Sequence, residues 1–319
     1  MKEIGGYMEI EHYNGTEYYS NLLHLNTGRN AIVLAALEKQ YTKIWIPHYL
    51  CDCVSLALNK NGIDFDYYNL NSNFEPDQFN TVCRDGVAIL LVNYFGMFNN
   101  DSLVKKQKRF GNIIVDNTHS FFQSPVSSID TIYTARKYFG VPDGAYLHLT
   151  CPSKYYENLE DDYSHIRMNY LAGRFECSAN QFYDEFCISD RCLEHEKIKK
   201  MSSLTKNILC SIDYDRVILK RTENFNVLHN ALKSINQYEV LNHGGLYMYP
   251  LLLNNGYLIK RQLIEKKVYV PTLWPNVLKD CFLDSYEYYL ANNMLFLPID
   301  QRYDCTDMQY MLNIIEAFL

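Results

Sequence analysis

Hydrophobic residues in the first half of the chain fall into short runs separated by mixed stretches. The run Val87–Val92 contains no polar residue, which is typical of a parallel strand covered on both faces. Because such strands alternate with helical stretches, the pattern indicates an α/β fold with a mostly parallel sheet. In full, we expect strands at 43–47, 64–70, 87–92, 112–116, 130–135 and 145–149, and helices at 31–40, 54–59 and 102–110.

The second half of the chain has a different pattern. Residues 152–200 are polar, acidic and aromatic, and we expect helical segments and loops there. Beyond them the pattern predicts helices at 201–209, 214–232, 256–265 and 307–318, and strands at 247–253, 268–271 and 294–298. This order indicates an α+β layer. We therefore divide the chain into a large domain, residues 1–200, and a smaller C-terminal domain, residues 201–319.

Composition narrows the class of protein. With 319 residues, 48% hydrophobic and 21% charged, the chain is typical of a soluble globular protein. The net charge of −7 argues against nucleic acid as a partner. No run of about 18 apolar residues exists, so we expect no membrane span. The first residues carry acids and no apolar core, so we expect no secretory signal and a cytoplasmic protein.

The ten cysteines are scattered along the chain, and only Cys51 and Cys53 form a close pair. No second pair lies at the spacing of a metal site, so we expect reduced thiols and no bound metal.

Polar residues follow several of the predicted strands. Asn93, Asp116 and Lys137 each come at or just after a strand end, where ligands collect in parallel sheets. Gly28 lies at a helix start, with Asn26 or Thr27 as N-cap, and free N–H groups there favour an anion. Plainer alternatives exist: a capped helix at Gly28, a helix-capping Asp116, and a surface charge at Lys137.

Taken together, these residues fit one kind of chemistry. An aspartate that holds a pyridinium nitrogen and a lysine that captures an aldehyde are the two fixed features of a pyridoxal phosphate site. Asp116 and Lys137 supply these two groups. A hydroxyl near the lysine and an open helix start would hold the phosphate, and Thr134 and the Gly28–Arg29 turn supply those.

Five segments resemble a known family. Residues 134–145, Thr-Ala-Arg-Lys-Tyr-Phe-Gly-Val-Pro-Asp-Gly-Ala, look like the lysine segment of the DegT/DnrJ/EryC1 aminotransferases. Residues 115–119, Val-Asp-Asn-Thr-His, are similar to the family's Asp-x-x-Gln/His segment. Residues 26–31, 46–51 and 93–96 also follow in family order. The likeness covers most of residues 1–150 and weakens beyond them.

The resemblance implies a three-layer fold of pyridoxal phosphate transferase type I, and it implies residue roles. Lys137 would be the Schiff-base lysine, Asp116 would contact the pyridinium nitrogen, and His119 would lie near the phenolic oxygen of the ring. Thr134, Gly28 and Arg29 would bind the phosphate, and either Tyr49 or His48 would stack on the ring. Asn93 stands where many members have histidine, and we include it among the cofactor-binding residues.

The family also implies an activity. By this resemblance the chain would transfer an amino group, from glutamate as donor, to a keto group of a nucleotide-linked sugar, and would act as a homodimer. One alternative is a non-catalytic or regulatory relative that keeps the fold, and another is a pyridoxal phosphate enzyme acting on a non-sugar substrate. Because Lys137 and Asp116 are both present, catalysis is favoured, since a binding protein needs neither.

Overall fold

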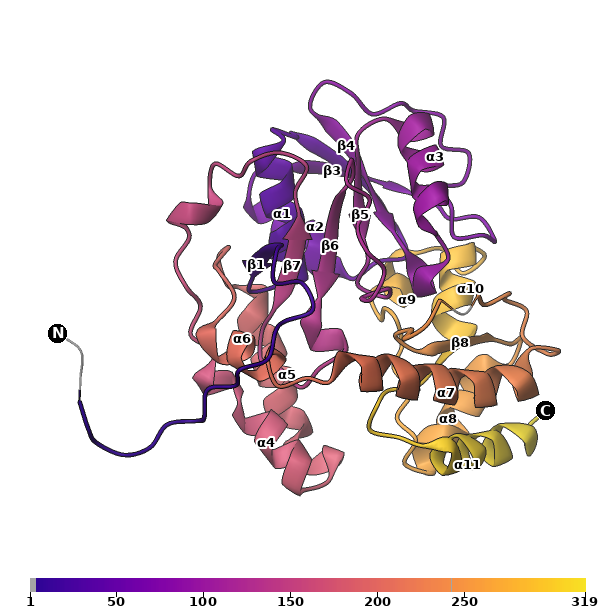
Figure 1. Cartoon of the computed structure of the whole chain (residues 1–319). Helices are drawn as coiled ribbons and strands as arrows, with labels where there is room; N and C mark the ends of the chain where they lie inside the picture. The colour runs from indigo at the N-terminus through magenta and orange to yellow at the C-terminus, as the bar shows by residue number, and fades with distance from the viewer. Residues whose placement is uncertain (1–3, 242) are drawn as a thin grey trace.

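A seven-stranded sheet forms the centre of the larger part of the protein (Figure 1). The computed structural model describes residues 4–241 and 243–319. The strands lie in the order β1-β7-β6-β5-β4-β2-β3; β2 to β6 are parallel, and β7 is antiparallel to both its neighbours. Their bounds are β1 Leu23–Leu25, β2 Lys43–Pro47, β3 Asp64–Tyr68, β4 Val87–Val92, β5 Ile113–Asp116, β6 Asp130–Thr134 and β7 Ala145–His148. The predicted α/β class with a mostly parallel sheet is confirmed.

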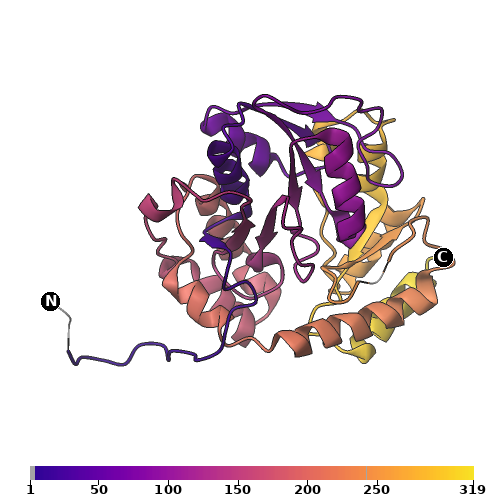
Figure 2. The same cartoon turned by 45° about the horizontal axis from the view of Figure 1, so that its top comes forward.

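Helices cover both faces of this sheet. The crossover from β2 to β3 contains α2 (Asp52–Lys60), and the crossover from β4 to β5 contains α3 (Asn100–Phe110). In the strand order, the step from β2 to β3 runs toward one edge of the sheet, and the step from β4 to β5 runs toward the other edge. Because both connections are right-handed, α2 and α3 lie on opposite faces of the sheet. Figure 2 shows α1 and α2 on one side of the strands and α3 on the other. The result is the expected three-layer arrangement.

Helix α1 (Gly28–Glu38) is buried on almost every side. Its alanines and branched aliphatic residues allow it to pack closely on β6 and β7. The helix begins three residues before the predicted start. Of the two candidate caps it uses Thr27, whose hydroxyl accepts a hydrogen bond from the Asn30 N–H at 3.3 Å.

A second, two-stranded sheet lies in the C-terminal part, where antiparallel β8 (Tyr249–Leu252) and β9 (Met294–Leu297) are both fully buried. Helices pack around them: α7 Tyr214–Leu232, α8 Gly256–Glu265, α9 Val277–Asp280, α10 Tyr286–Asn293 and α11 Cys305–Glu316. The bounds of α7 and α8 match the sequence prediction. The boundary near residue 200 stays a prediction.

Three points of the sequence prediction need correction or completion. The strand predicted at 268–271 is wrong, because those residues form no strand although Val270 is buried. Alternating apolar residues there pack a loop against the core. Residues 152–200 hold two helices, α4 (Asn169–Glu176) and α5 (Tyr183–Glu194), and α6 (Ser203–Leu209) follows. Strand β1 was not predicted, because three residues are too few to show a period.

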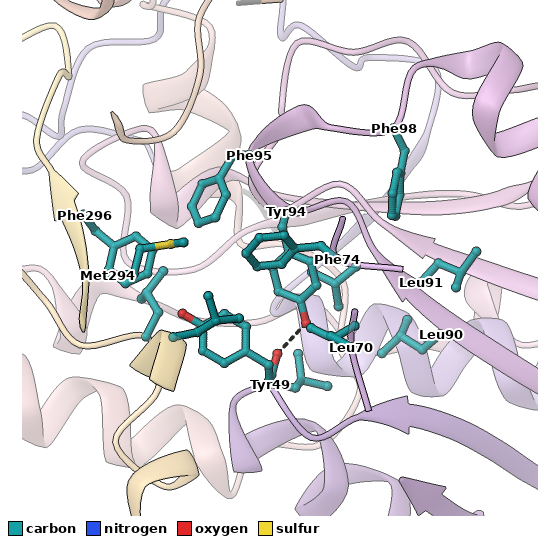
Figure 3. Packing of buried hydrophobic residues seen from close by; sticks show 14 of the residues in the cluster. Tyr49, Leu70, Phe74, Leu90, Leu91, Tyr94, Phe95, Phe98, Met294 and Phe296 are labelled. Carbon is teal, nitrogen blue, oxygen red and sulfur yellow. Dashed lines mark hydrogen bonds between the residues drawn. The ribbon is translucent and has the colours of Figure 1, made fainter. Parts of the chain in front are cut away.

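The core between the two sheets is strongly aromatic. Tyr49, Phe74, Tyr94, Phe95 and Phe296 pack together, and Figure 3 shows their rings converging on the space beside β9. The Tyr94 hydroxyl donates a hydrogen bond to the backbone carbonyl of Tyr49. This packing fixes the loop after β2 against the C-terminal part.

Across the residues that the structure describes, we find no helix with the length and apolar character needed to cross a bilayer.

Candidate active site

The carboxyl ends of β4, β5 and β6 meet at one edge of the sheet. Val92 pairs with Asp116, and Asp116 pairs with Ile132, so the three strands end nearly level. Asn93 follows β4 directly, and a short 3-10 turn, Ala135–Lys137, follows β6. The register therefore gathers the predicted polar residues at this edge.

Asp116 is a buried carboxylate with a defined orientation. Its side chain is 7% exposed, and Oδ1 accepts a hydrogen bond from the Thr118 N–H at 2.8 Å. Burial raises the pKa of Asp116, while hydrogen bonds from Thr118 and the charge of Lys137 oppose that rise. A cation beside this carboxylate would favour its ionised form.

Lys137 is half-buried at the end of the turn after β6, and its charge acts on the pKa of both Asp116 and His119. Its Nζ lies 5.5 Å from the centre of the Tyr247 ring. Tyr247 is the largest cause of a raised pKa at Lys137, and it outweighs burial, which lowers that pKa. The lysine, the aspartate and the histidine thus form one group at the sheet edge.

His119 is fully buried among aromatic rings. It stacks on Phe95 and Tyr247, each at a centroid distance of 5.1 Å, and on Trp274 at 5.9 Å. Burial and the charge of Lys137 lower the pKa of His119 to about 3, so the imidazole is neutral at neutral pH. Its Nδ1 is buried without a hydrogen-bond partner. A neutral imidazole keeps one donor and one acceptor, which a ligand can use.

Two threonines and the start of α1 form a small polar cup. The hydroxyls of Thr118 and Thr134 lie 3.1 Å apart. A Cβ added to Gly28 would lie only 2.6 Å from the Thr134 hydroxyl oxygen, so the cup requires glycine there. The N–H groups of Gly28 and Arg29 are in the first turn of α1, where no intrahelical acceptor exists. Hydroxyls and free N–H groups around one space suit a phosphate.

The turn after Lys137 is held by a buried carboxylate. Asp143 accepts hydrogen bonds from the Ser202 N–H at 2.8 Å, from the Ser202 hydroxyl at 2.7 Å and from the Thr205 hydroxyl. Gly144 has φ +120°, and its N–H donates to the Asn26 carbonyl at 2.7 Å. The Pro-Asp-Gly turn therefore ties β6, the start of α1 and α6 together.

Asn93 and the predicted residues of the loop after β2 contact other protein side chains and backbone groups. Asn93 is fully buried, and it bonds to Asn117, to Gln123 and to both polar backbone groups of Phe98. Tyr49 is also fully buried, and the centre of its ring lies 5.1 Å from that of Trp274. His48 stacks on Tyr67, with ring centres 4.5 Å apart. Contact of these residues with a cofactor stays a prediction.

A cavity of about 640 Å³ opens beside Lys137. Its wall includes Thr134 and Tyr247, and aromatic side chains from α4 and α5. Four arginines also line it: Arg136, Arg174, Arg221 and Arg302. Arg136 pairs with Asp190 of α5 at 3.1 Å. Arg302 pairs with Asp300, which also lines the wall, at 2.7 Å, so the cavity presents charges of both signs to a substrate.

Several site residues were not predicted from the sequence. Tyr247 and Trp274 come from the C-terminal part and reach His119 only through folding, so no local signal marks them. Thr118 lies inside the quoted 115–119 segment, and its hydroxyl could have been noted. Asp143 lies inside the quoted 134–145 segment, where Asp between Pro and Gly indicates a turn and gives no sign of its distant partners Ser202 and Thr205.

The residues present fit pyridoxal phosphate. The cup at Gly28, Thr118 and Thr134 has the donors for its phosphate, and the buried carboxylate of Asp116 needs a cation. The unpaired Nδ1 of His119 is a buried polar atom that a ligand can satisfy. Lys137 supplies an amine within the same group of side chains.

Known structures share this fold. No protein-family model and no curated protein sequence matches the chain. Among solved structures, a DegT DnrJ EryC1 StrS aminotransferase from Brucella abortus is 12% identical over 93% of this chain and 85% of its own, with a TM-score of 0.63. The sugar aminotransferase CalS13 from Micromonospora echinospora is 12% identical over 93% and 87%, with a TM-score of 0.60. Spr1654 from Streptococcus pneumoniae in its PLP form is 14% identical over 93% and 87%, with a TM-score of 0.62.

These matches establish the fold. The chain has the architecture of the type I pyridoxal phosphate transferases over nearly its whole length. Because identities of 12 to 14% do not fix an activity, function has to be argued from the site itself.

Proposed function

We propose that this protein is a pyridoxal phosphate-dependent aminotransferase related to the DegT/DnrJ/EryC1 family. The observation that carries the proposal is the placement of Lys137, Asp116 and His119 in one buried group next to a polar cup at the start of α1. The shared fold with sugar aminotransferases supports it.

Each residue has a defined task in this proposal. Thr118, Thr134 and the N–H groups of Gly28 and Arg29 hold the phosphate. Asp116 keeps a proton on the ring nitrogen, and His119 offers a hydrogen bond to the ring's phenolic oxygen. The bound cofactor supplies an electron sink that stabilises a carbanion at the substrate carbon.

Lys137 has two tasks. With the cofactor bound, the Lys137 amine would hold its aldehyde group, and Nζ would serve as the proton carrier at the substrate carbon. Both tasks need the neutral amine, while Tyr247 raises the pKa of the Lys137 ammonium in the protein alone. The aromatic rings of Tyr247 and Trp274 exclude water around His119.

The substrates in the proposal are glutamate as donor and a nucleotide-linked keto-sugar as acceptor. In the cavity wall, Arg174 makes no ion pair among the described residues and suits a carboxylate of the first or the diphosphate of the second. The aromatic side chains of α4 and α5, among them Tyr170, Tyr183 and Phe186, offer faces for a nucleotide base.

We also propose a homodimer. Residues 4–12 extend away from the body of the protein (Figure 1), and Ile4, Tyr7 and Met8 are almost fully exposed. Exposed large apolar side chains on an extended segment favour burial against another chain.

Transfer of the amino group tests the activity directly. Protein loaded with pyridoxal phosphate and freed of excess cofactor is mixed with glutamate. We expect release of 2-oxoglutarate and formation of pyridoxamine phosphate in equal amounts, and neither product with Lys137→Ala. If no amino donor gives these products while the cofactor stays bound, the non-catalytic alternative is correct. Acceptors are then compared as a panel of nucleotide-linked keto-sugars.

A further inference from the structure

Two thiols lie next to Lys137 and have no task in the proposed function. Cys51 is the N-cap residue of α2, and Cys53 is the second residue of that helix. Both are free and half-buried, and hydrogen bonding between their side chains is the largest cause of the pKa change at each. The Cys51 thiol also donates to Oδ1 of Asp52 at 3.6 Å. The charge of Lys137 acts on both sulfurs, and the charge of Arg29 acts on Cys53.

Cys51 is also open to a small reagent. It lines a second cavity of about 190 Å³, together with His48, Asp52 and Asp280. A water molecule takes up about 30 Å³ in the liquid, so the cavity has room for a reagent that is a little larger than water. Cys53 does not line this cavity and lies behind its partner.

The surroundings of Cys51 favour its thiolate. The hydrogen bond from Cys53 is the largest cause of a lowered pKa at Cys51, and Lys137 adds to it. Burial and the carboxylate of Asp52 oppose this change. The backbone N–H of Cys53, in the first turn of α2, also lowers the pKa of Cys51. Burial instead raises the pKa of Cys83 and of Cys281 to about 11.

We propose that Cys51 and Cys53 are a peroxide-sensitive dithiol that closes to a disulfide beside Lys137. A cavity that admits hydrogen peroxide to one sulfur, and a second thiol in contact with that sulfur, are the two features that this chemistry needs. Cys83, by contrast, is buried, and burial with no neighbouring thiol among the described residues accounts for its raised pKa.

The reaction balances in two steps. The Cys51 thiolate attacks one oxygen of hydrogen peroxide, the O–O bond breaks, and hydroxide leaves, so the sulfur becomes a sulfenic acid. Cys53, after losing its proton, attacks that sulfur, the S–O bond breaks, and the oxygen leaves as water. Overall, two thiols and one hydrogen peroxide give one disulfide and two waters.

The chain is well suited to a mapping experiment. Trypsin cleaves after Lys43 and Lys60, so both cysteines lie in one peptide, residues 44–60, with no third cysteine. The full-length protein is treated with one equivalent of hydrogen peroxide, alkylated and digested. We expect this peptide to lose two hydrogens and to resist alkylation until a reductant is added. The exposed Cys177, Cys192 and Cys305 serve as internal controls and should stay alkylated.

Variants separate the two sulfurs. In Cys53→Ser the bridge cannot form, so dimedone should trap the sulfenic acid at Cys51. At pH 7, Cys51 of the unaltered protein should be alkylated about threefold or more faster than Cys177, because a larger thiolate fraction outweighs lower nucleophilicity. Cys53→Ala should reduce that advantage, whereas Cys53→Ser keeps a hydrogen-bond donor and should preserve it.

The inference is wrong if residues 44–60 keep two alkylatable thiols while the exposed cysteines are oxidised, or if Cys51 is alkylated no faster than Cys177. Neither readout uses a cofactor. A failure of Lys137 to take up pyridoxal phosphate would therefore contradict the proposed function and leave the dithiol result unaffected.

Discussion

Replacing Gly28 by alanine tests the phosphate cup most sharply. The new Cβ would lie 2.6 Å from the Thr134 hydroxyl oxygen, closer than nonbonded atoms tolerate. Either Thr134 rotates away from Thr118, to which it now lies at 3.1 Å, or the start of α1 moves. In both cases the cup loses a donor for the phosphate.

The expected magnitudes follow from these contacts. Overpacking of this kind costs about 1 to 3 kcal/mol of folding free energy, and alanine recovers at most about 1 kcal/mol through helix propensity. A lost hydrogen bond to a charged phosphate costs about 1.5 to 3 kcal/mol of binding free energy. At about 1.4 kcal/mol for each factor of ten, pyridoxal phosphate should bind about ten- to a hundredfold more weakly.

Two threonine variants control this experiment. Thr134→Val removes the hydroxyl with little change of shape and should weaken binding as Gly28→Ala does. Thr134→Ser keeps the hydroxyl and should bind like the unaltered protein. Affinity is measured by cofactor titration, and stability by chemical unfolding. If Gly28→Ala and Thr134→Val bind the cofactor with unchanged affinity, the phosphate lies elsewhere and our reading of the cup is refuted.

Three further predictions concern other parts of the structure. Lys137 is cationic at neutral pH, and Tyr247 raises its pKa further, so cofactor capture in stopped-flow traces should speed up as the pH rises. Tyr247→Phe should shift this profile to lower pH, and an unchanged profile would exclude Tyr247 as the cause of the raised pKa. Arg221→Met leaves the backbone carbonyls of Leu246 and Tyr247 without this buried donor, while the Tyr138 carbonyl keeps the Gln301 amide as donor. It should cost about 3 kcal/mol or more of unfolding free energy, whereas the exposed Arg216→Met on the same helix should change that energy by less than about 0.5 kcal/mol. Deletion of residues 2–12 should convert the proposed dimer to monomer in light scattering; a dimer that survives the deletion would place the interface elsewhere.

Local sequence patterns predicted the sheet edge well. Val87–Val92 is uninterrupted and apolar, and it forms the interior strand β4. Residues 28, 116, 134 and 137 each follow a recognisable strand end or precede a helix, so their common location could be inferred from parallel-sheet geometry. The exact bounds of α7 also followed from its amphipathic period.

Long-range contacts escaped prediction for a physical reason. Tyr247 and Trp274 are far from His119 in sequence, and only the packing of the C-terminal part brings the rings together. The three-residue strand β1 forms because β7 offers it an edge, not because of its own composition. The strand predicted at 268–271 does not form, because alternating apolar residues can also be buried in a loop.

The most direct test of the central claim is to find where pyridoxal phosphate attaches. Protein mixed with the cofactor is reduced with borohydride, digested and sequenced by mass spectrometry. The account predicts that the cofactor is fixed to Lys137, and that Asp116→Asn keeps this attachment while losing transfer activity. Attachment at another lysine, or an equal yield of the adduct with Lys137→Ala, would contradict it.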